Sequence, residues 1–281
     1  MRIVITGAAG MLGSDVRAAC DAAGHEPVAL ARAALDIGDE ASVQRAIAQA
    51  QPDLVINCAA WTNVDGAEEH YEQALAVNGP GAGNVARAAA SNGAWTIHVS
   101  SDYVFDGNKT TPYLESDPAD PISAYGRSKF EGELAVARAA PEQYTIVRSA
   151  WLFGATGKCF PKTILRLAAE RDELNIVADQ VGCPTYTGHL AQALVALAGQ
   201  APLGLLHVAS AGQCSWFEFA REIVARGGVD CVVRPIPTEQ YPLPAKRPAY
   251  SALQSERGAP TLPGWTDGLR DFLSQIAEVP A

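Results

Sequence analysis

The chain has 281 residues, of which 48% are hydrophobic, and its formal net charge is −10 at pH 7. This length is enough for a large core and for one or two domains, and the composition is ordinary for a globular protein. The negative charge disfavours nonspecific nucleic-acid binding, so an anionic ligand needs a local cradle of positive groups or backbone N–H donors. No apolar run approaches the roughly 18 residues that a membrane-spanning helix requires.

Cysteine usage and the start of the chain bear on the cellular compartment. The six cysteines show no paired C-x-x-C spacing, which disfavours a zinc cluster and is typical of reduced thiols. Met1 leads almost directly into the strand-like RIVIT, without a signal peptide between them. We therefore expect a cytoplasmic protein that acts on neither membranes nor nucleic acids.

Short apolar runs alternate with helical stretches through the first half of the chain. Ala-rich segments with helical periodicity, such as residues 11–24 and 41–51, separate these runs. Strand–helix alternation predicts an α/β fold with a doubly wound parallel sheet that carries helices on both faces. The expected buried strands are RIVIT (residues 2–6), PVALA (27–31), DLVIN (53–57), TIHVS (96–100) and YTIVRS (144–149).

Three glycines follow the first predicted strand. Gly7, Gly10 and Gly13 form G-x-x-G-x-x-G between this strand and a helix that opens with Met11 and Leu12. Glycines permit the tight turn and the close approach of a pyrophosphate, and the helix N-terminus offers free N–H groups. The pattern predicts a dinucleotide site; the alternative is a glycine-rich turn without a ligand.

Because of the dinucleotide site predicted at the glycine turn, we expect residues 1–150 to form a dinucleotide-binding Rossmann domain. The regular alternation weakens after about Ala150, and proline-rich stretches appear, notably residues 234–248. We expect residues 151–281 to form a smaller C-terminal lobe, interleaved with late elements of the Rossmann sheet.

The end of the second predicted strand bears on cofactor choice. An acidic residue that bonds the ribose 2′-OH is the usual sign of NAD, but this chain offers Arg32 there and no carboxylate before Asp36. An arginine can pair with a 2′-phosphate, so NADPH is favoured and NADH stays possible. The alternative for Arg32 is a solvated surface residue. Asp36 and Ile37 would lie beside the adenine; the alternative for Asp36 is a loop-capping role.

Tyr125 and Lys129 are four residues apart, so they share one face of the predicted helix. Alone, this spacing is more typical of an ordinary amphipathic helix than of a catalytic pair. However, Ser100 and Ser101 end the fourth predicted strand shortly before it. Serine or threonine after the fourth strand, followed by Y-x-x-x-K, resembles the catalytic set of the short-chain dehydrogenase/reductase superfamily, and the glycine pattern resembles its extended branch.

Six ordered motifs narrow the resemblance to the dTDP-4-dehydrorhamnose reductase family, and together they span most of the chain. They are VINCAAWTNVDGAE (residues 55–68), HVSSDYVFDG (98–107), SAYGRSKFEGE (123–133), IVRSAWLFG (146–154), ADQVGCPTYTGHLA (178–191) and RPAYSALQ (247–254).

The resemblance implies NADPH-dependent reduction of the C4 ketone of a dTDP-linked 6-deoxysugar, with dTDP-4-dehydrorhamnose as the first candidate. Tyr125 would donate the proton to the carbonyl oxygen. Lys129 would lower the pKa of this tyrosine and bond the nicotinamide ribose. Ser101 would hold the carbonyl oxygen and share its developing charge. The smaller lobe would bind the substrate.

The resemblance also implies ligand contacts. Small residues in the loop after the third strand, Ala59 and Ala60, would line the cofactor together with Thr62. Trp151 would face the sugar, although it could equally be core. Lys162 and Arg247 would meet the substrate pyrophosphate, unless they are solvated. The complete set expected at the substrate is Ser101, Asp102, Tyr103, Trp151 and Arg247.

Two departures from the family pattern concern Ser101 and the metal. The family often has threonine where this chain has Ser101, whose hydroxyl can still donate a hydrogen bond. Some members bind magnesium through acidic residues at a dimer interface. Here Asp15 and His189 occupy that neighbourhood without an evident carboxylate cluster, so we expect no metal.

Rival functions share the fold and the Tyr–Lys pair. Sugar dehydratases of the superfamily typically place glutamate where this chain has Tyr103, which disfavours dehydration. An epimerase, another dTDP-sugar 4-ketoreductase of secondary metabolism, and a non-catalytic NADP-binding subunit of the kind that accompanies methionine adenosyltransferase stay open. The sequence leaves the choice between monomer and homodimer open as well.

Overall fold

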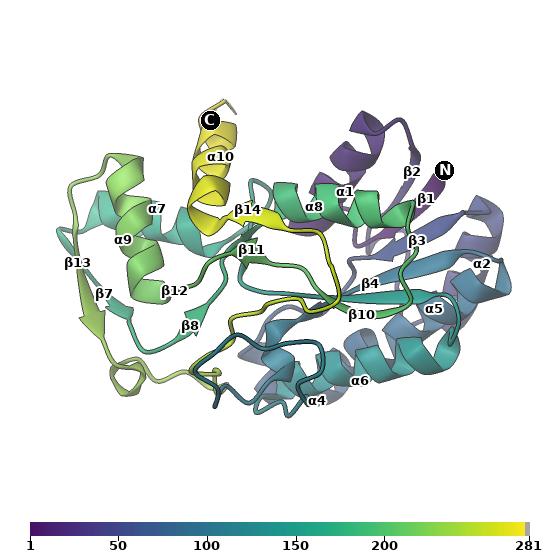
Figure 1. Ribbon diagram of the computed structural model, residues 1–281, viewed down its shortest axis with the longest axis horizontal. Helices are drawn as coiled ribbons and strands as arrows, with labels where there is room; N and C mark the ends of the chain where they lie inside the picture. The colour runs from purple at the N-terminus through teal and green to yellow at the C-terminus, as the bar shows by residue number, and fades with distance from the viewer. Residues whose placement is uncertain (279–281) are drawn as a thin grey trace.

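A six-stranded parallel sheet is the centre of the larger lobe in the computed structural model, which describes residues 1–278 (Figure 1). Its strands are β1 (Arg2–Thr6), β2 (Glu26–Leu30), β3 (Leu54–Asn57), β4 (Trp95–Ser101), β5 (Tyr144–Ser149) and β10 (Gly204–His207). Their order is β10-β5-β4-β3-β1-β2, and all neighbours are parallel. The order reverses between β1 and β3, which is where open α/β sheets bind ligands.

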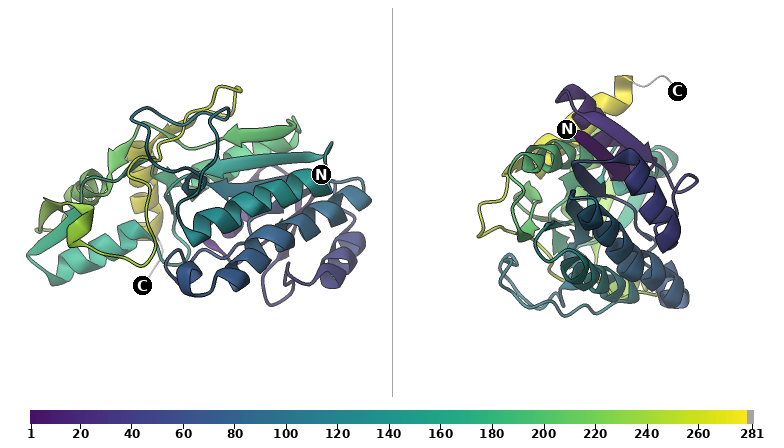
Figure 2. Two further views of the ribbon diagram at one scale, coloured as in Figure 1. Left: turned by 90° about the horizontal axis from the view of Figure 1, so that it is seen from below. Right: turned by 90° about the vertical axis from the view of Figure 1, so that its right-hand side faces the viewer.

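Helices cover both faces of the sheet, as Figures 1 and 2 show. Alternate residues of β1 point to opposite faces. Ile3 and Ile5 pack with apolar residues of α1 and α8, and Val4 packs with those of α2 and α5. The helices on the first face are α1 (Met11–Ala22) and α8 (Thr187–Ala198), and those on the second are α2 (Glu40–Ala50), α5 (Ala82–Ser91) and α6 (Ala124–Ala139). The predicted doubly wound sheet is confirmed.

The smaller lobe has its own apolar core, which includes Phe153, Ile164, Phe219 and Phe272. Its two longer strands pair in parallel. The lobe is built from α7 (Phe160–Glu170), β7 (Glu173–Val177), α9 (Trp216–Gly227), β13 (Val232–Ile236) and α10 (Trp265–Glu278). Short elements connect it to the sheet, namely β6 (Leu152–Phe153), β8 (Val181–Gly182), β9 (Thr185–Tyr186), β11 (Ser210–Ala211), β12 (Cys214–Ser215), η3 (Thr238–Gln240) and β14 (Leu262–Gly264).

The chain returns to the larger lobe after it has entered the smaller one. β10 pairs with β5 at the edge of the sheet, and α8 packs against α1. Both elements follow residue 150, so the smaller lobe is interleaved with the sheet. The boundary between residues 1–150 and 151–281 itself stays a prediction.

No helix within residues 1–278 has both the length and the apolar composition needed to span a bilayer.

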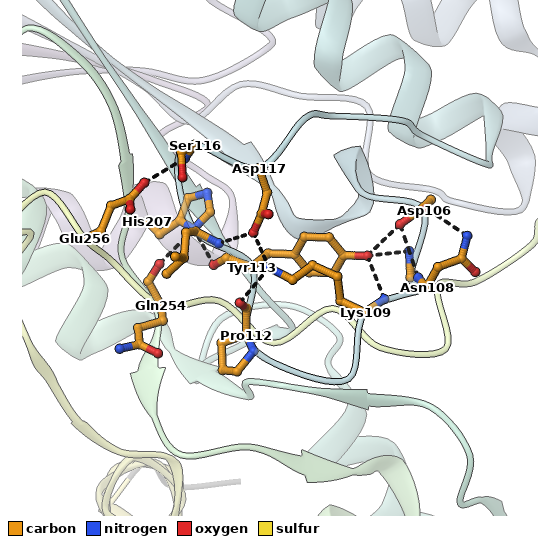
Figure 3. A network of polar contacts seen from close by, with 12 residues as sticks. Asp106, Asn108, Lys109, Pro112, Tyr113, Ser116, Asp117, His207, Gln254 and Glu256 are labelled. Carbon is orange, nitrogen blue, oxygen red and sulfur yellow. Dashed lines mark hydrogen bonds and ion pairs between the residues drawn. The ribbon is translucent and has the colours of Figure 1, made fainter.

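The long connection between β4 and α6 is held against β10 by a polar network (Figure 3). The Tyr113 hydroxyl donates to Asp106 Oδ1 at 2.6 Å, and the Tyr113 carbonyl lies 3.0 Å from His207 Nδ1 on β10. The Gln254 N–H donates to the same carbonyl at 3.0 Å. The network therefore fixes the chain that leaves the carboxyl end of β4.

The remaining short helices are α3 (Gly66–Glu69), α4 (Tyr71–Ala76), the π-helix η1 (Val77–Gly81) and η2 (Asp102–Val104).

Candidate active site

A cavity of about 680 Å³ runs along the carboxyl ends of β1, β3 and β4 and reaches the first residue of α9. Its walls contain every residue predicted to bind the cofactor and four of the five predicted to bind the substrate; Arg247 does not line it. The lining residues that the sequence predicted are Gly7, Gly10, Met11, Leu12, Gly13, Arg32, Asp36, Ile37, Ala59, Ala60, Thr62, Ser101, Asp102, Tyr103, Tyr125, Lys129 and Trp151.

The glycine turn has no room for side chains. Gly7 has φ +64°, and a Cβ on it would lie 2.7 Å from the backbone nitrogen of Ala59. A Cβ on Gly13 would lie 2.3 Å from the Gly7 carbonyl oxygen. No side chain within residues 1–278 caps α1, whose N-cap is Gly10, so the N–H groups of its first turn are available to an anion. The turn therefore fits a dinucleotide pyrophosphate.

The end of β2 presents an exposed cation. Arg32 lies on the surface and lines the cavity. Asp36 lines it too, but its Oδ1 also accepts a hydrogen bond from the Gly38 N–H at 2.9 Å, so this residue caps a loop as the alternative interpretation proposed. Ile37 is buried and also lines the cavity. A 2′-phosphate bound here would meet the positive charge of Arg32, next to the apolar surface of Ile37.

The loop after β3 is held to the helix that carries Tyr125. Asn78 Oδ1 accepts from the Trp61 N–H at 2.8 Å, and Asn78 Nδ2 donates to the Trp61 carbonyl at 3.1 Å. The same nitrogen donates to Ser128 Oγ at 2.9 Å, and this hydroxyl donates to the Tyr125 carbonyl at 2.7 Å. One buried amide thus positions the cofactor loop and the first turn of α6 relative to each other.

The start of α6 is doubly capped. Ser123 Oγ accepts from the Gly126 N–H at 3.1 Å, and Glu68 Oε1 accepts from the Ala124 N–H at 2.8 Å. Both contacts satisfy free N–H groups of the first turn. They fix the position of Tyr125, whose ring meets the Tyr103 ring edge-on with centroids 5.5 Å apart.

Tyr125, Ser101 and Lys129 converge on the cavity as the sequence predicted. Burial and, to a smaller degree, the charge of Asp102 raise the pKa of Tyr125 to about 12, although a hydrogen bond with Ser101 acts in the opposite direction. Lys129 Nζ donates to the Val99 carbonyl at 2.8 Å, and burial lowers its pKa to about 8. Desolvation of the phenolate dominates this shift, and the lowering of the tyrosine pKa by Lys129 stays a prediction. A proton donor at neutral pH needs only to hold its proton, which this phenol does.

Asp102 is a buried carboxylate beside the tyrosine. Ser101 Oγ donates to its Oδ1 at 3.0 Å, and Ser251 Oγ donates to its Oδ2 at 2.6 Å. Burial raises the pKa of Asp102 to about 6, although the bonds from Ser251 and Ser101 act in the opposite direction. The carboxylate thus joins the end of β4 to the segment that carries the RPAYSALQ motif.

The two cations predicted to meet the substrate pyrophosphate have protein partners. Arg247 forms a two-point ion pair with Asp65 and donates to the Ala245 carbonyl. Lys162 donates to the carbonyls of Ala155 and Gly157 and does not line the cavity. Both side chains shape loops, and their predicted contact with the substrate stays a prediction.

Sequence reasoning missed several further lining residues, among them Trp61, Lys158 and Trp216. Lys158 follows the glycines of GATGK after β6, a pattern that could have marked it. Trp216 opens α9 next to its cap Ser215, and its ring lies parallel to that of Trp151, with centroids 3.5 Å apart. Trp151 is therefore a wall of the cavity and contacts an aromatic residue of the other lobe.

The neighbourhood of Asp15 and His189 contains one more acid. His189 Nε2 lies 2.9 Å from Asp271 Oδ2. Burial raises the pKa of Asp15, and a hydrogen bond with Thr187 acts in the opposite direction. Within residues 1–278, no three His, Cys, Asp or Glu side chains are grouped so that they could hold a metal ion.

Comparisons with known proteins agree with this geometry. The family model described as the RmlD substrate binding domain matches residues 1–278. A dTDP-4-dehydrorhamnose reductase of Mycobacterium tuberculosis is 45% identical over 98% of this chain and 91% of its own. The spore coat polysaccharide biosynthesis protein SpsK of Bacillus subtilis is 39% identical over 98% of this chain and 97% of its own.

Solved structures give the same result. A dTDP-4-dehydrorhamnose reductase from Clostridium acetobutylicum has a TM-score of 0.95 at 40% identity, covering 99% of this chain and 100% of that one. The Bacillus anthracis enzyme in complex with NADP has a TM-score of 0.94 at 37% identity, covering 98% and 99%. UDP-glucose 4-epimerases, such as that of Thermus thermophilus at 22% identity, share the fold alone. The chain therefore belongs to the family of the RmlD substrate binding domain, and the predicted resemblance to dTDP-4-dehydrorhamnose reductases is confirmed.

Proposed function

We propose that this protein is an NADPH-dependent reductase that converts dTDP-4-dehydrorhamnose to dTDP-rhamnose. The observation that carries the proposal is the convergence of Tyr125, Ser101 and Lys129 on the cavity that also contains the glycine turn. Relatives named dTDP-4-dehydrorhamnose reductase, at 42–45% identity over almost the whole chain, support this substrate.

Each residue has a separate role in the proposed reaction. The bound cofactor supplies the hydride that reduces C4 of the sugar. Tyr125 donates its phenolic proton to the carbonyl oxygen, and its raised pKa keeps the proton in place until charge develops on that oxygen. Ser101 lies beside both Tyr125 and Asp102, so its hydroxyl can orient the same oxygen. Lys129 places a positive charge beneath the site and is positioned by the Val99 carbonyl.

The cofactor assignment rests on the glycine turn and on Arg32. The N–H groups at the start of α1 would receive the pyrophosphate, and Arg32 would pair with the 2′-phosphate. The relative from Bacillus anthracis binds NADP, which supports NADPH; NADH stays possible. We further propose that the protein works in the cytoplasm, as a monomer or a homodimer.

A second candidate is reduction of a different dTDP-linked 4-keto sugar. A dTDP-4-keto-6-deoxy-D-glucose reductase from Streptomyces niveus is 40% identical over 95% of this chain, close to the identity of the rhamnose-pathway relatives. An epimerase or a non-catalytic NADP-binding subunit would keep the same Tyr–Lys pair. Reductive turnover separates the proposed reductase from both.

The decisive experiment measures NADPH consumption against a panel of dTDP-4-keto sugars and determines the C4 configuration of each product by NMR. The proposal expects dTDP-4-dehydrorhamnose to give the highest kcat/KM and dTDP-rhamnose as the product. A higher kcat/KM for dTDP-4-keto-6-deoxyglucose would select the second candidate, and no NADPH consumption with any sugar would overturn both.

A further inference from the structure

Trp151 and Trp216 form a stacked pair that crosses from one lobe to the other. Trp151 follows β5 in the larger lobe, and Trp216 is the first residue of α9 in the smaller lobe. Their rings are 3.5 Å apart and inclined by only 3°, and both residues line the cavity that contains Tyr125. Aromatic pairs more often prefer offset or edge-on arrangements, so a face-to-face contact with centroids only 3.5 Å apart needs support from its surroundings.

The backbone of Trp151 and two neighbouring residues, Gly182 and Phe160, hold this arrangement in place. Trp151 has φ +47°, a left-handed backbone conformation that a bulky residue rarely adopts. A Cβ on Gly182 would lie 2.4 Å from Cε2 of the Trp151 ring, so the absence of a side chain on β8 makes room for the indole. On the other side of the pair, the Phe160 ring lies 4.5 Å from that of Trp216.

The start of α9 is fixed independently of the stack. Ser215 and Glu218 form a complete capping box, in which Ser215 Oγ accepts from the Glu218 N–H at 3.1 Å and Glu218 Oε2 accepts from the Ser215 N–H at 2.8 Å. The capping box fixes the backbone of the first turn of α9, and so the direction in which the Trp216 side chain projects from it. The smaller lobe therefore presents a rigid aromatic surface to Trp151.

We propose that Trp216 is a positioning residue for the sugar nucleotide: by stacking on Trp151, it holds that indole as a wall of the cavity against which the substrate packs. This inference rests on the proposed reductase function. Without the stack, the Trp151 side chain would be free to rotate. Substrate binding would then have to order the indole, and this ordering would lower the affinity for the substrate. The ring contacts of Trp216 are with Trp151, Phe160 and Phe219, and none of these three is a predicted cofactor residue, so we expect substrate affinity to depend on Trp216 more than cofactor affinity does.

The test uses Trp216→Phe, which keeps an aromatic ring on Phe160 but removes one indole of the pair. Two stacked indoles give an exciton couplet in the circular dichroism spectrum, and loss of either indole abolishes it. We expect Trp216→Phe to lose the couplet and to raise the KM for the sugar nucleotide roughly 2- to 12-fold, the range expected of an aromatic pair. The kcat should change less than KM, and the Kd for NADPH should not change.

Trp265→Phe is the matched control. Trp265 is also the first residue of a helix in the smaller lobe and also packs on Phe219, but it does not line the cavity. This variant should keep the couplet and the wild-type KM. A Trp216→Phe variant that keeps the couplet, or that loses it with an unchanged sugar-nucleotide KM, would overturn the inference. An equal rise in the NADPH Kd would overturn it too, because the effect would then be general.

A second measurement separates this inference from the proposed function. If the wild type turned over no keto-sugar nucleotide, the reductase proposal would fail, and calorimetric binding of dTDP-rhamnose would take the place of KM. Weaker binding by Trp216→Phe than by Trp265→Phe would then support the positioning role, and equal binding would refute it.

Discussion

The two terminal nitrogens of the Arg247 guanidinium each lie 2.7 Å from a different carboxylate oxygen of Asp65. Asp65 Oδ1 also accepts from the Ala245 N–H at 3.1 Å, and Arg247 interacts with the Tyr103 side chain. Residues 182 positions apart in sequence thus meet beside the site. The Arg247 side chain is only 14% exposed, so this pair is screened less than an ordinary surface ion pair.

We expect Asp65→Asn and Arg247→Met each to lower the free energy of unfolding by about 1 to 3 kcal/mol, between the values for exposed and buried pairs. Urea denaturation of both single variants and the double variant gives the coupling energy, which should exceed about 1 kcal/mol. A coupling near zero would show that solvent screens the pair. If Arg247 also met the substrate, Arg247→Met would raise KM well above the value for Asp65→Asn.

Tyr125→Phe should keep cofactor binding and lose most turnover, because it removes only the proton donor. General acid catalysis is worth about 10²–10⁴-fold, so kcat should fall by that factor. NADPH affinity, followed by fluorescence titration, is the internal control. Turnover within about threefold of wild type would remove Tyr125 from the role of proton donor.

Arg32→Ala should weaken the preference for NADPH over NADH. Charge-assisted hydrogen bonds are worth about 1.5–3 kcal/mol, although the solvent exposure of Arg32 places the expected change at the lower end, roughly tenfold in kcat/KM. NADH efficiency should be nearly unchanged, since NADH has no 2′-phosphate. Steady-state kinetics with both cofactors decides the matter. Equal efficiencies in the wild type would refute the preference, and an unaltered ratio in the variant would assign it to another residue.

Asp102→Asn should stabilise the protein more at high pH than at low pH. Burial raises the folded-state pKa of Asp102 to about 6 from its ordinary value of 3.8, so the folded protein binds more protons between these values. The native carboxylate therefore costs stability as pH rises through this window. Asparagine removes that cost, and its stabilising effect should be about 1 to 2 kcal/mol larger at pH 8 than at pH 5.

Denaturation of wild type and Asp102→Asn at both pH values measures this difference. Because all other titratable groups are shared, their contributions cancel in the comparison. An effect of the substitution that is independent of pH would show that the Asp102 carboxyl titrates normally.

The parts of the molecule that the sequence predicted are those encoded in contiguous residues. The strand RIVIT, the glycine turn and the helical spacing of Tyr125 and Lys129 each depend on neighbours a few positions away, and all of them lie where they were expected. The edge strand β10 was not predicted, because four residues give too short a pattern to distinguish a strand from a turn.

Contacts between distant segments were not predictable in the same way. Lys162 was expected at a pyrophosphate, but it donates instead to carbonyls of the loop that precedes its helix, α7. The partnership of Arg247 with Asp65 and the stack of Trp216 on Trp151 depend on how separate segments meet in space. The raised pKa of Tyr125 was not predicted for a related reason, since the depth at which α6 is buried is a property of the whole fold.

The late return of the chain to the sheet affects how the protein must be synthesised. The apolar residues Leu12, Val16 and Cys20 of α1 share a core with Leu190 and Leu194 of α8, and β5 gains its outer neighbour only with β10. A nascent chain that has emerged only as far as β5 therefore has an open sheet edge and a bare apolar helix face. The first 150 residues cannot complete this core before α8 and β10 have followed, so native packing of the larger lobe has to wait until synthesis has passed His207.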